Sequence, residues 1–471
     1  MKRCTLGVII GNRDFFPDQL VKTGRQELLK ALRQAGVDAV ILDDKAAKLG
    51  AVETYADAQR CSELFRRERD RIDGILVSLP NFGDEKGVLE VIKQSRLDVP
   101  VLVQAFPDTV GKLTPADRRD SFCGKISVTN NLYQANIPFT LTGLHTVFPK
   151  EAAFAADLER FTGVCRVVRG LRGARLGAIG ARPNAFNTVR YSEKILEANG
   201  ISVSTVDLSE IFAAADKLAG SAAGKRKAQA IRGYCDTSAV PADRVAKMAC
   251  LAIAIEQWMA ANDLQASAVQ CWTSMQQNYG INPCTLMSML SDKLLPCACE
   301  VDVTGALTMY AMQLASGTPS ALADWNNNYA DQPDKCVLFH CSNWAKCFID
   351  QPRMSYSPIL ASTLGPDSTV GTLSGRTRPG PITLARLSTD DAAGVICGYV
   401  TEGTVTDDEL DTFGSCAVVR INELQDLLRF VCLEGFEHHV AMNLSSCSSI
   451  LSEALTTYLG WEIYDHPVDQ R

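Results

Sequence analysis

Four acidic or imidazole side chains stand where apolar segments of the sequence end. A short apolar run ends in Glu300 and Asp302, a second apolar segment delivers Asp324, and a third ends in His340. Two carboxylates with one or two imidazoles suit Mn²⁺, Fe²⁺ or Co²⁺ better than a structural zinc ion. Such a cation can hold two adjacent oxygens of a sugar and lower the pKa of the proton between them, and a nearby carboxylate can move that proton. The pattern predicts a site for a hard divalent cation.

Histidine is scarce in this chain, which contains five, so the pair at His438 and His439 is informative. Side chains alternate along a strand, so we expect these two rings to face opposite sides and only one of them to reach a common site. A lone buried histidine is more often a hydrogen-bonded core residue than a ligand. Taken singly, Glu300 and Asp324 are equally well explained as helix caps and His340 as a core residue. The metal hypothesis depends on these residues occurring together.

The elements that must position these residues begin with an α/β domain over residues 1–168. Strand-like runs at 3–11, 37–44, 73–80 and 99–106 are separated by amphipathic helices, which predicts a parallel sheet with helical crossovers. Ligands bind beyond the carboxyl ends of such strands. Polar residues follow those ends, and we expect three of them to contact a ligand: Arg13, Asn81 and Gln104. The alternative is turn chemistry, which uses the same residue types in these loops.

A second alternating segment at 169–352 predicts a second α/β domain, which carries the acidic candidates. Gly177 and Gly180 precede a helix, but Gly-x-x-Gly alone is weak evidence for a nucleotide, and the sequence has no GxGxxG or Walker A motif. From residue 353 the segments are short, β-branched and punctuated by glycine, which predicts an antiparallel barrel or sandwich. The expected fold is α/β, with two doubly wound parallel-sheet (Rossmann-like) domains followed by a β-rich barrel domain at 353–471.

Composition limits the classes of partner. The net charge of −7 and an isoelectric point of about 5.4 favour neither nucleic acid nor an anionic membrane. No apolar stretch approaches the ~20 residues of a membrane span, and the first apolar run is too short for a signal peptide. The seventeen cysteines are scattered, without paired CxxC motifs. We therefore expect a cytoplasmic protein with mostly reduced, buried thiols.

Taken in order, these residues resemble the L-fucose and L-arabinose isomerases, in particular the fucose-isomerase-like branch. The resemblance is carried by Glu-x-Asp before a helix, by an acidic residue and a histidine at family-like spacing, and by Gly-x-x-His-His at 435–439. The segments NRDFFPD and LPNFGDE of the first domain are similar to the same branch. The resemblance extends over almost the whole chain.

The resemblance implies an aldose–ketose isomerase that uses Mn²⁺, or Co²⁺ or Fe²⁺ in its place, and works on a free monosaccharide through a cis-enediol. Glu300 and Asp324 would bind the metal and serve as acid and base on either side of the sugar C1–C2 bond. One histidine of the late pair would complete the coordination, with His438 favoured over His439. His340 is a ligand in the arabinose branch and is a further candidate.

The resemblance also implies a homo-oligomer, a trimer or hexamer, whose active sites are shared between subunits. Asp302 would support a ligand or cap the following helix. Some members of the branch act on sulfoquinovose, whose sulfonate needs a basic pocket, and Arg13, Arg182 and Arg190 match it by charge. The candidate substrate-binding residues are Arg13, Asn81, Gln104, Arg182, Arg190 and Trp272. The alternative function is a non-catalytic cytosolic sugar-binding or sensor protein built on paired α/β domains.

Overall fold

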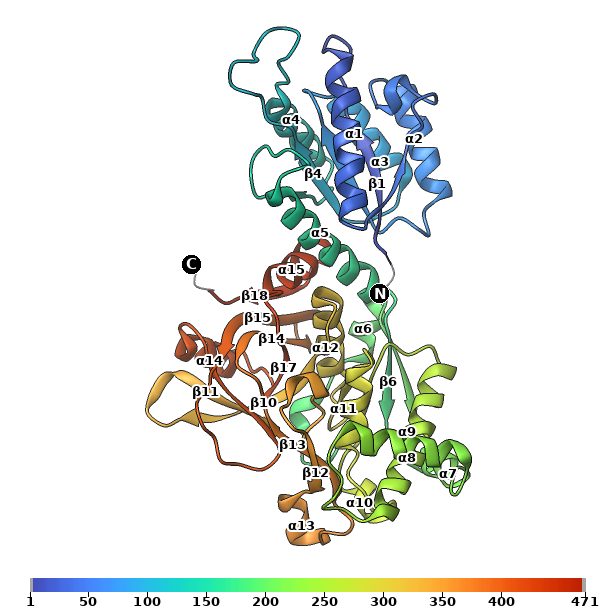
Figure 1. Ribbon diagram of the computed structural model, residues 1–471, viewed down its shortest axis with the longest axis vertical. Coiled ribbons are helices and arrows are strands. Elements are labelled where there is room, and N and C mark those ends of the chain that lie inside the picture. Colours follow the sequence, from blue (N-terminus) through green and yellow to red (C-terminus); the bar gives the residue numbers. More distant parts are fainter. Residues whose placement is uncertain (1–2, 468–471) are drawn as a thin grey trace. The chain divides into compact units, whose positions relative to one another are not determined.

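A computed structural model describes residues 3–467, and the chain divides into two compact units (Figure 1). Unit 1 comprises Met1–Arg169 and Glu453–Gly460. Unit 2 comprises Gly170–Ser452 and Trp461–Arg471.

Unit 1 is built on a five-stranded parallel sheet with the strand order β2-β1-β3-β4-β5. Every residue of β1, β3 and β4 is buried, as expected for strands of a parallel sheet covered on both faces. The strands are β1 (Thr5–Ile10), β2 (Asp38–Ile41), β3 (Gly74–Leu79), β4 (Val101–Ala105) and β5 (Thr140–Leu141). The helices are α1 (Asp18–Gln34), α2 (Tyr55–Arg67), α3 (Glu85–Ser95), α4 (Ser121–Gln134) and α5 (Ala152–Leu171).

Unit 2 begins with a four-stranded parallel sheet in the order β7-β6-β8-β9. Its strands are β6 (Arg175–Ile179), β7 (Ser202–Val206), β8 (Ala266–Val269) and β9 (Cys297–Ala298). The accompanying helices are α6 (Glu193–Ala198), α7 (Leu208–Asp216), α8 (Ala222–Tyr234), α9 (Ala242–Ala261), α10 (Ser274–Asn278), α11 (Cys284–Asp292) and α12 (Val303–Ser316). The two parallel sheets confirm the predicted α/β fold class.

A nine-stranded, mostly antiparallel sheet follows, and six of its strands close into a ring. The order is β12-β13-β16-β11-β10-β17-β14-β15-β18, and β15 also pairs with β16, so β16, β11, β10, β17, β14 and β15 form a barrel as predicted. The strands are β10 (Ala321–Tyr329), β11 (Gln332–His340), β12 (Arg353–Tyr356), β13 (Val370–Arg376), β14 (Gly380–Asp390), β15 (Val395–Val405), β16 (Ser415–Arg420), β17 (His439–Asn443) and β18 (Glu462–Asp465). The remaining helices are α13 (Pro358–Leu364), α14 (Leu424–Leu433) and α15 (Ser448–Ser452), and short helical turns span Lys48–Gly50, Asn187–Val189, Lys346–Phe348 and Glu453–Tyr458.

The barrel begins earlier in the sequence than residue 353, because the hairpin β10–β11 supplies two of its strands. Asp324 and His340 therefore lie on barrel strands. Helix α12 is buried along almost its whole length and contacts β6, β8 and β9 of the parallel sheet as well as β14 and β17 of the barrel. Helix α12 thus lies against both the parallel sheet and the barrel (Figure 1).

Two further predictions can be compared with the structure. All seventeen cysteines lie within residues 3–467, carry free thiols and are mostly buried. Within the same residues, no helix is long and apolar enough to cross a membrane.

Candidate metal centre

Glu300 lies in the tight connection between β9 and α12. Both Glu300 and Val301 adopt left-handed backbone conformations, with φ of 53° and 55°. This region is costly for residues other than glycine, above all for a β-branched valine, and such strain collects at functional sites. The turn places Glu300 beyond the carboxyl end of a parallel strand, where α/β sheets bind ligands.

Strand pairing in the barrel places Asp324 beside His439. The two residues are direct partners in the antiparallel register of β10 and β17, so their side chains share one face. Asp324 Oδ1 lies 3.4 Å from His439 Nε2, and Glu300 Oε2 lies 3.4 Å from the same nitrogen. His340 Nε2 is 3.7 Å from Glu300 Oε2. The predicted carboxylates and two of the predicted histidines therefore meet in one place.

The orientation of His439 is set by Asp302. His439 Nδ1 lies 2.8 Å from Asp302 Oδ2, and both side chains are buried. Burial raises the pKa of Asp302, but the positive charge of Arg386 and the interaction with His439 outweigh burial and hold that pKa well below its usual range. An ionised carboxylate only accepts hydrogen bonds, so Nδ1 donates and the lone pair of Nε2 faces Glu300 and Asp324. His439 thus presents a ligand atom to the site.

The ring of His340 differs from that of His439 in the hydrogen bond that its Nδ1 makes. Its Nδ1 accepts a hydrogen bond from the backbone N–H of Cys341 at 2.9 Å. Its Nε2 faces Glu300 Oε2 at 3.7 Å, which is beyond hydrogen-bond distance. His340 therefore offers Nε2 as a further candidate ligand atom beside Glu300 and His439.

Arg386 is a buried residue of the candidate site that sequence reasoning missed. It is completely buried on β14, with contacts of 2.5 and 3.0 Å to Asp302 and of 3.0 and 2.9 Å to Glu437. Removing a guanidinium from water costs several kcal/mol unless carboxylates pair with it, as they do here. The signal in the sequence was an arginine within the apolar run PITLARL.

Asp302 also caps helix α12, which is one of the two roles expected of it. Its Oδ1 accepts the backbone N–H of Gly305 at 2.8 Å. A Cβ atom at Gly305 would lie 2.4 Å from Asp302 Oδ2, so this close approach requires glycine. The cap holds the carboxylate between Arg386 and His439.

One oxygen of Glu300 lacks a partner. Oε1 accepts hydrogen bonds from Trp272 Nε1–H at 2.9 Å and from the Cys271 thiol at 3.3 Å, whereas buried Oε2 has no hydrogen-bond donor among residues 3–467. Burial raises the pKa of Glu300, but the interactions with His340, His439 and Trp272 outweigh burial and lower it to about 2. A buried anionic oxygen is costly unless a donor or a cation neutralises it.

The donor set fits a divalent cation. Glu300, His340 and His439 offer ligand atoms within 4.8 Å of one another, and so do Asp324, His438 and His439. Carboxylate oxygens with imidazole nitrogen suit Mn²⁺, Fe²⁺ or Co²⁺. The structure therefore contains a buried candidate metal site whose donors come from β10, β11, β17 and the loop after β9.

His438 differs from the expected alternation. It precedes β17, its ring centroid lies 4.4 Å from that of His439, and its Nε2 lies 3.7 Å from Asp324 Oδ1. Both rings thus face Asp324, because strand geometry begins only at His439. The His438 side chain is 39% exposed, and burial and the neighbouring His439 lower its pKa, which favours a neutral ring. It lines a cavity of about 690 Å³ together with Trp325.

Three predicted substrate-binding residues of unit 2 contact Glu300 or line a cavity beside its neighbour Val301. Trp272 contacts Glu300 directly and packs edge-on against Phe186 at 5.0 Å between ring centroids. Arg182 and Arg190 line a cavity of about 240 Å³, and Val301, the neighbour of Glu300, forms part of its wall.

The three predicted residues of unit 1 have partners within that unit. Arg13 pairs with Glu85, and its guanidinium lies 4.2 Å from the ring centroid of Phe82. Asn81 is fully buried and donates to Asn12 Oδ1 at 2.6 Å. Gln104 is also fully buried, and it accepts from Ser78 and donates to the carbonyl of Val147. These contacts hold the loops at the carboxyl edge of the sheet.

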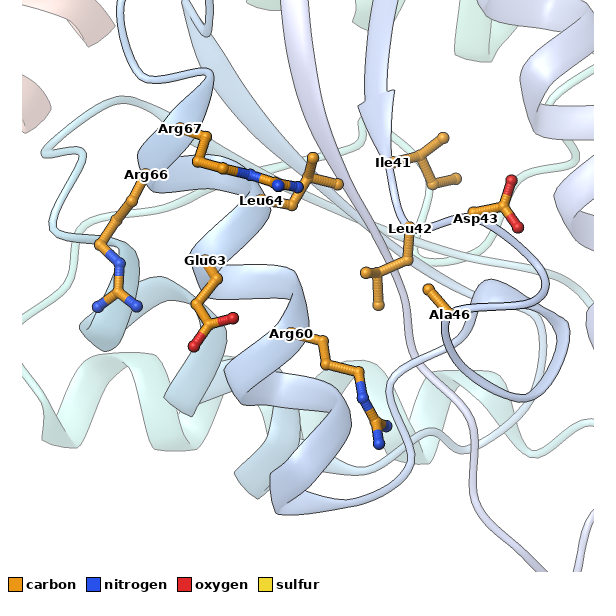
Figure 2. Close-up of a pocket in the computed structure, with 9 residues that line it drawn as sticks. All are labelled: Ile41, Leu42, Asp43, Ala46, Arg60, Glu63, Leu64, Arg66 and Arg67. Atoms are coloured by element: carbon orange, nitrogen blue, oxygen red, sulfur yellow. The ribbon is translucent and has the colours of Figure 1, made fainter.

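Another hollow in unit 1, of about 680 Å³, lies beside the edge strand β2 (Figure 2). It lies between the end of that strand and helix α2, and its lining includes both acidic and basic side chains. The lining residues are Ile41, Leu42, Asp43, Ala46, Arg60, Glu63, Leu64, Arg66 and Arg67, so the predicted site residues are elsewhere.

Comparison with known proteins identifies the family. Residues 7–172 match the model of the fucose/sulfoquinovose isomerase N-terminal domain, and residues 338–466 match that of the L-fucose isomerase C-terminal domain. His340, His438 and His439 lie in the second match, whereas Glu300 and Asp324 lie between the two.

The curated relatives share less than 30% of their aligned residues with this chain. A sulfoquinovose isomerase of Priestia aryabhattai is 25% identical over 279 residues, which cover 58% of this chain and 59% of the relative. A sulfoquinovose isomerase of Clostridium sp. (strain MSTE9) is 29% identical over 202 residues, 42% of this chain and 44% of the relative. The chain thus spans less than two thirds of the length of these relatives.

A solved structure of an ABC transporter solute-binding protein from Burkholderia multivorans is 9% identical and covers 68% of this chain and 95% of its own. Its TM-score of 0.18 is too low to support an argument. On the evidence of the two domain matches, this chain belongs to the fucose/sulfoquinovose isomerase family.

Proposed function

We propose that this protein is a metal-dependent aldose–ketose isomerase that acts on a free monosaccharide through a cis-enediol. The observation that carries the proposal is the unpartnered, buried oxygen of Glu300, which faces His439 Nε2 at 3.4 Å. Asp324 Oδ1 lies at the same distance from that nitrogen. An ionised oxygen is stable in such a position when a cation occupies the space between the three groups.

Glu300, Asp324 and His439 would hold the cation, with Mn²⁺ as the first choice and Co²⁺ or Fe²⁺ as alternatives. The hydrogen bond from His439 Nδ1 to Asp302 supports His439 as the ligand, in place of the His438 expected from the family pattern. A bound divalent cation would polarise the oxygens on C1 and C2 of the open-chain sugar and acidify the hydrogen on C2.

The two carboxylates would move the proton between C2 and C1. Glu300 is 4% exposed and Asp324 is more open to the solvent, with a side chain that is 25% exposed. His340, whose Nε2 lies 3.7 Å from Glu300 Oε2, would be a further ligand, and the partly exposed His438 would face the substrate. Trp272 would form a wall of the site, since it already donates to Glu300.

Sulfoquinovose is the proposed substrate class, supported by the names of the relatives and by the pair of arginines lining one cavity beside Val301. A guanidinium pairs with a sulfonate through several N–H donors in a fixed plane, so Arg182 and Arg190 would select an anionic sugar. Arg13, Asn81 and Gln104 stay proposed contacts for the far end of the sugar, within a homo-oligomer that shares its sites.

The test is to incubate the purified protein, loaded with Mn²⁺, with sulfoquinovose, L-fucose, D-arabinose and L-arabinose in ²H₂O, and to follow the ketose by NMR. We expect one sugar to react, with deuterium from the solvent at C1 of the product, because an enediol exchanges the transferred proton. Chelation should abolish the reaction, and Mn²⁺ should restore it. Glu300→Gln should keep its circular dichroism spectrum but form no ketose.

Two results would overturn the proposal. Ketose formation in metal-free protein would exclude the assigned chemistry. Calorimetric binding of a sugar without metal and without turnover would instead identify a sugar-binding protein.

A further inference from the structure

Two buried thiols lie beside Glu300. Cys271 follows β8 and Cys299 follows β9, which are neighbouring strands of the parallel sheet. Their side chains are buried, and the Cys271 thiol lies 3.3 Å from Glu300 Oε1. The Sγ atom of Cys299 lies 3.8 Å from His340 Nδ1. One ligand atom from each of Cys271, Cys299 and Glu300 lies within 4.8 Å of the others.

Glu300 therefore stands between two donor sets of different character. Its Oε2 faces His439 and His340, while its Oε1 faces the thiol of Cys271. Thiolates select soft or borderline cations such as Zn²⁺ and Cd²⁺, whereas carboxylates suit harder ions such as Mn²⁺. One oxygen of the same carboxylate is thus within reach of a hard site, and its other oxygen is within reach of a thiol-rich site.

The thiol side has the dimensions of a cation site. Sulfur atoms about 2.3 Å from a tetrahedral zinc ion are about 3.8 Å apart, so ligand atoms within 4.8 Å need only small side-chain movements to converge. Cys336, a buried cysteine of the barrel, has different surroundings, because its thiol contacts the carbonyl oxygen of Val419 at 3.8 Å. A carboxylate beside two thiols distinguishes this pair from core cysteines that only fill space.

We propose that Cys271, Cys299 and Glu300 form a second site for a thiophilic divalent cation of the Zn²⁺ or Cd²⁺ class, which competes with the ion of the isomerase site for Glu300. Binding forms two metal–sulfur bonds and one metal–oxygen bond and releases the two thiol protons to the solvent, without a redox change. The site itself does not depend on isomerase activity. The competition rests on the proposed function, because it requires a cation held by Glu300 Oε2.

The first experiment is a titration of metal-free protein with Cd²⁺, followed by the ultraviolet charge-transfer absorption of cadmium–thiolate bonds. We expect one equivalent to bind with this absorption and the absorption to disappear in Cys271→Ala/Cys299→Ala. Cys336→Ala, which removes a buried thiol from the barrel, should retain it. Absence of the band in the wild-type protein, or its persistence in the double variant, would overturn the assignment.

The second experiment measures Mn²⁺ affinity by electron paramagnetic resonance, with and without one equivalent of Cd²⁺. We expect Cd²⁺ to weaken Mn²⁺ binding at least tenfold in the wild-type protein and to leave it unchanged in the double variant. Equal Mn²⁺ affinity with and without thiolate-bound Cd²⁺ would disprove the sharing of Glu300. If the protein shows cadmium–thiolate absorption but isomerises none of the sugars, only the proposed function is refuted and the thiol site is supported.

Discussion

Replacement of Arg386 by methionine tests whether the buried ion network orients the metal ligand. The guanidinium is fully buried and pairs with Asp302 and Glu437, which are 0% and 4% exposed. Methionine fills much of the same space but leaves both carboxylates without their countercharge. Asp302 then either takes up a proton or leaves its position, and in both cases its hydrogen bond with His439 Nδ1 weakens.

The magnitude follows from the burial. Removing one partner of a buried ion pair destabilises a protein by about 3–5 kcal/mol, because an uncompensated charge stays behind. Loss of the carboxylate that orients a metal-binding histidine typically weakens metal affinity by about 10- to 100-fold. We expect Arg386→Met to show both effects, measured by urea unfolding of the metal-free protein and by calorimetric titration with Mn²⁺.

A matched control is Arg420→Met on β16. Arg420 donates to Asp334 at 3.0 Å, but both side chains are about half exposed, at 55% and 50%, so the expected loss is below about 1 kcal/mol. Arg386→Lys supplies a second variant in case Arg386→Met does not fold, since it keeps the charge but loses the two-pronged contact with Asp302. Wild-type stability together with wild-type Mn²⁺ affinity in Arg386→Met would refute the positioning argument.

Three further predictions concern titration and close packing. The pKa of Glu300 falls from 4.5 to about 2, so its ionisation stabilises the fold above about pH 4.5, and this contribution is lost as the pH falls toward 2. The difference in unfolding free energy between the wild-type protein and Glu300→Gln should therefore change over that range. A constant difference would contradict the shift. Burial lowers the pKa of Lys125 from 10.5 to about 8, so the unfolded chain binds more protons between these values; stability should rise with pH there, and Lys125→Met should remove that rise in urea unfolding curves. Gly305→Ala should destabilise the protein by about 1–3 kcal/mol and weaken Mn²⁺ binding, since its Cβ would lie 2.4 Å from Asp302 Oδ2. Gly233→Ala, whose Cβ meets nothing within 4 Å in helix α8, should be neutral or stabilising by roughly 0.5–1 kcal/mol, and an equal loss in both variants would rule out the steric explanation.

The architecture was largely predictable from local patterns. Continuous apolar runs separated by amphipathic helices indicated parallel sheets, and short glycine-punctuated segments indicated a barrel, because side-chain periodicity and turn chemistry are local properties. The start of the barrel was not predictable in this way. The hairpin β10–β11 follows α12 directly, and only its pairing with β16 and β17 assigns it to the barrel.

The sequence by itself determined which side chains are available: two carboxylates, scarce histidines and the order in which they occur. It could not determine how they are oriented, since that depends on segments far apart in the chain. Strand register places Asp324 opposite His439, Asp302 turns His439 toward the site, and the backbone N–H of Cys341 holds Nδ1 of His340. Arg386 escaped notice because a buried arginine is stable only beside carboxylates that the tertiary fold delivers, here from the start of α12 and from the loop before β17.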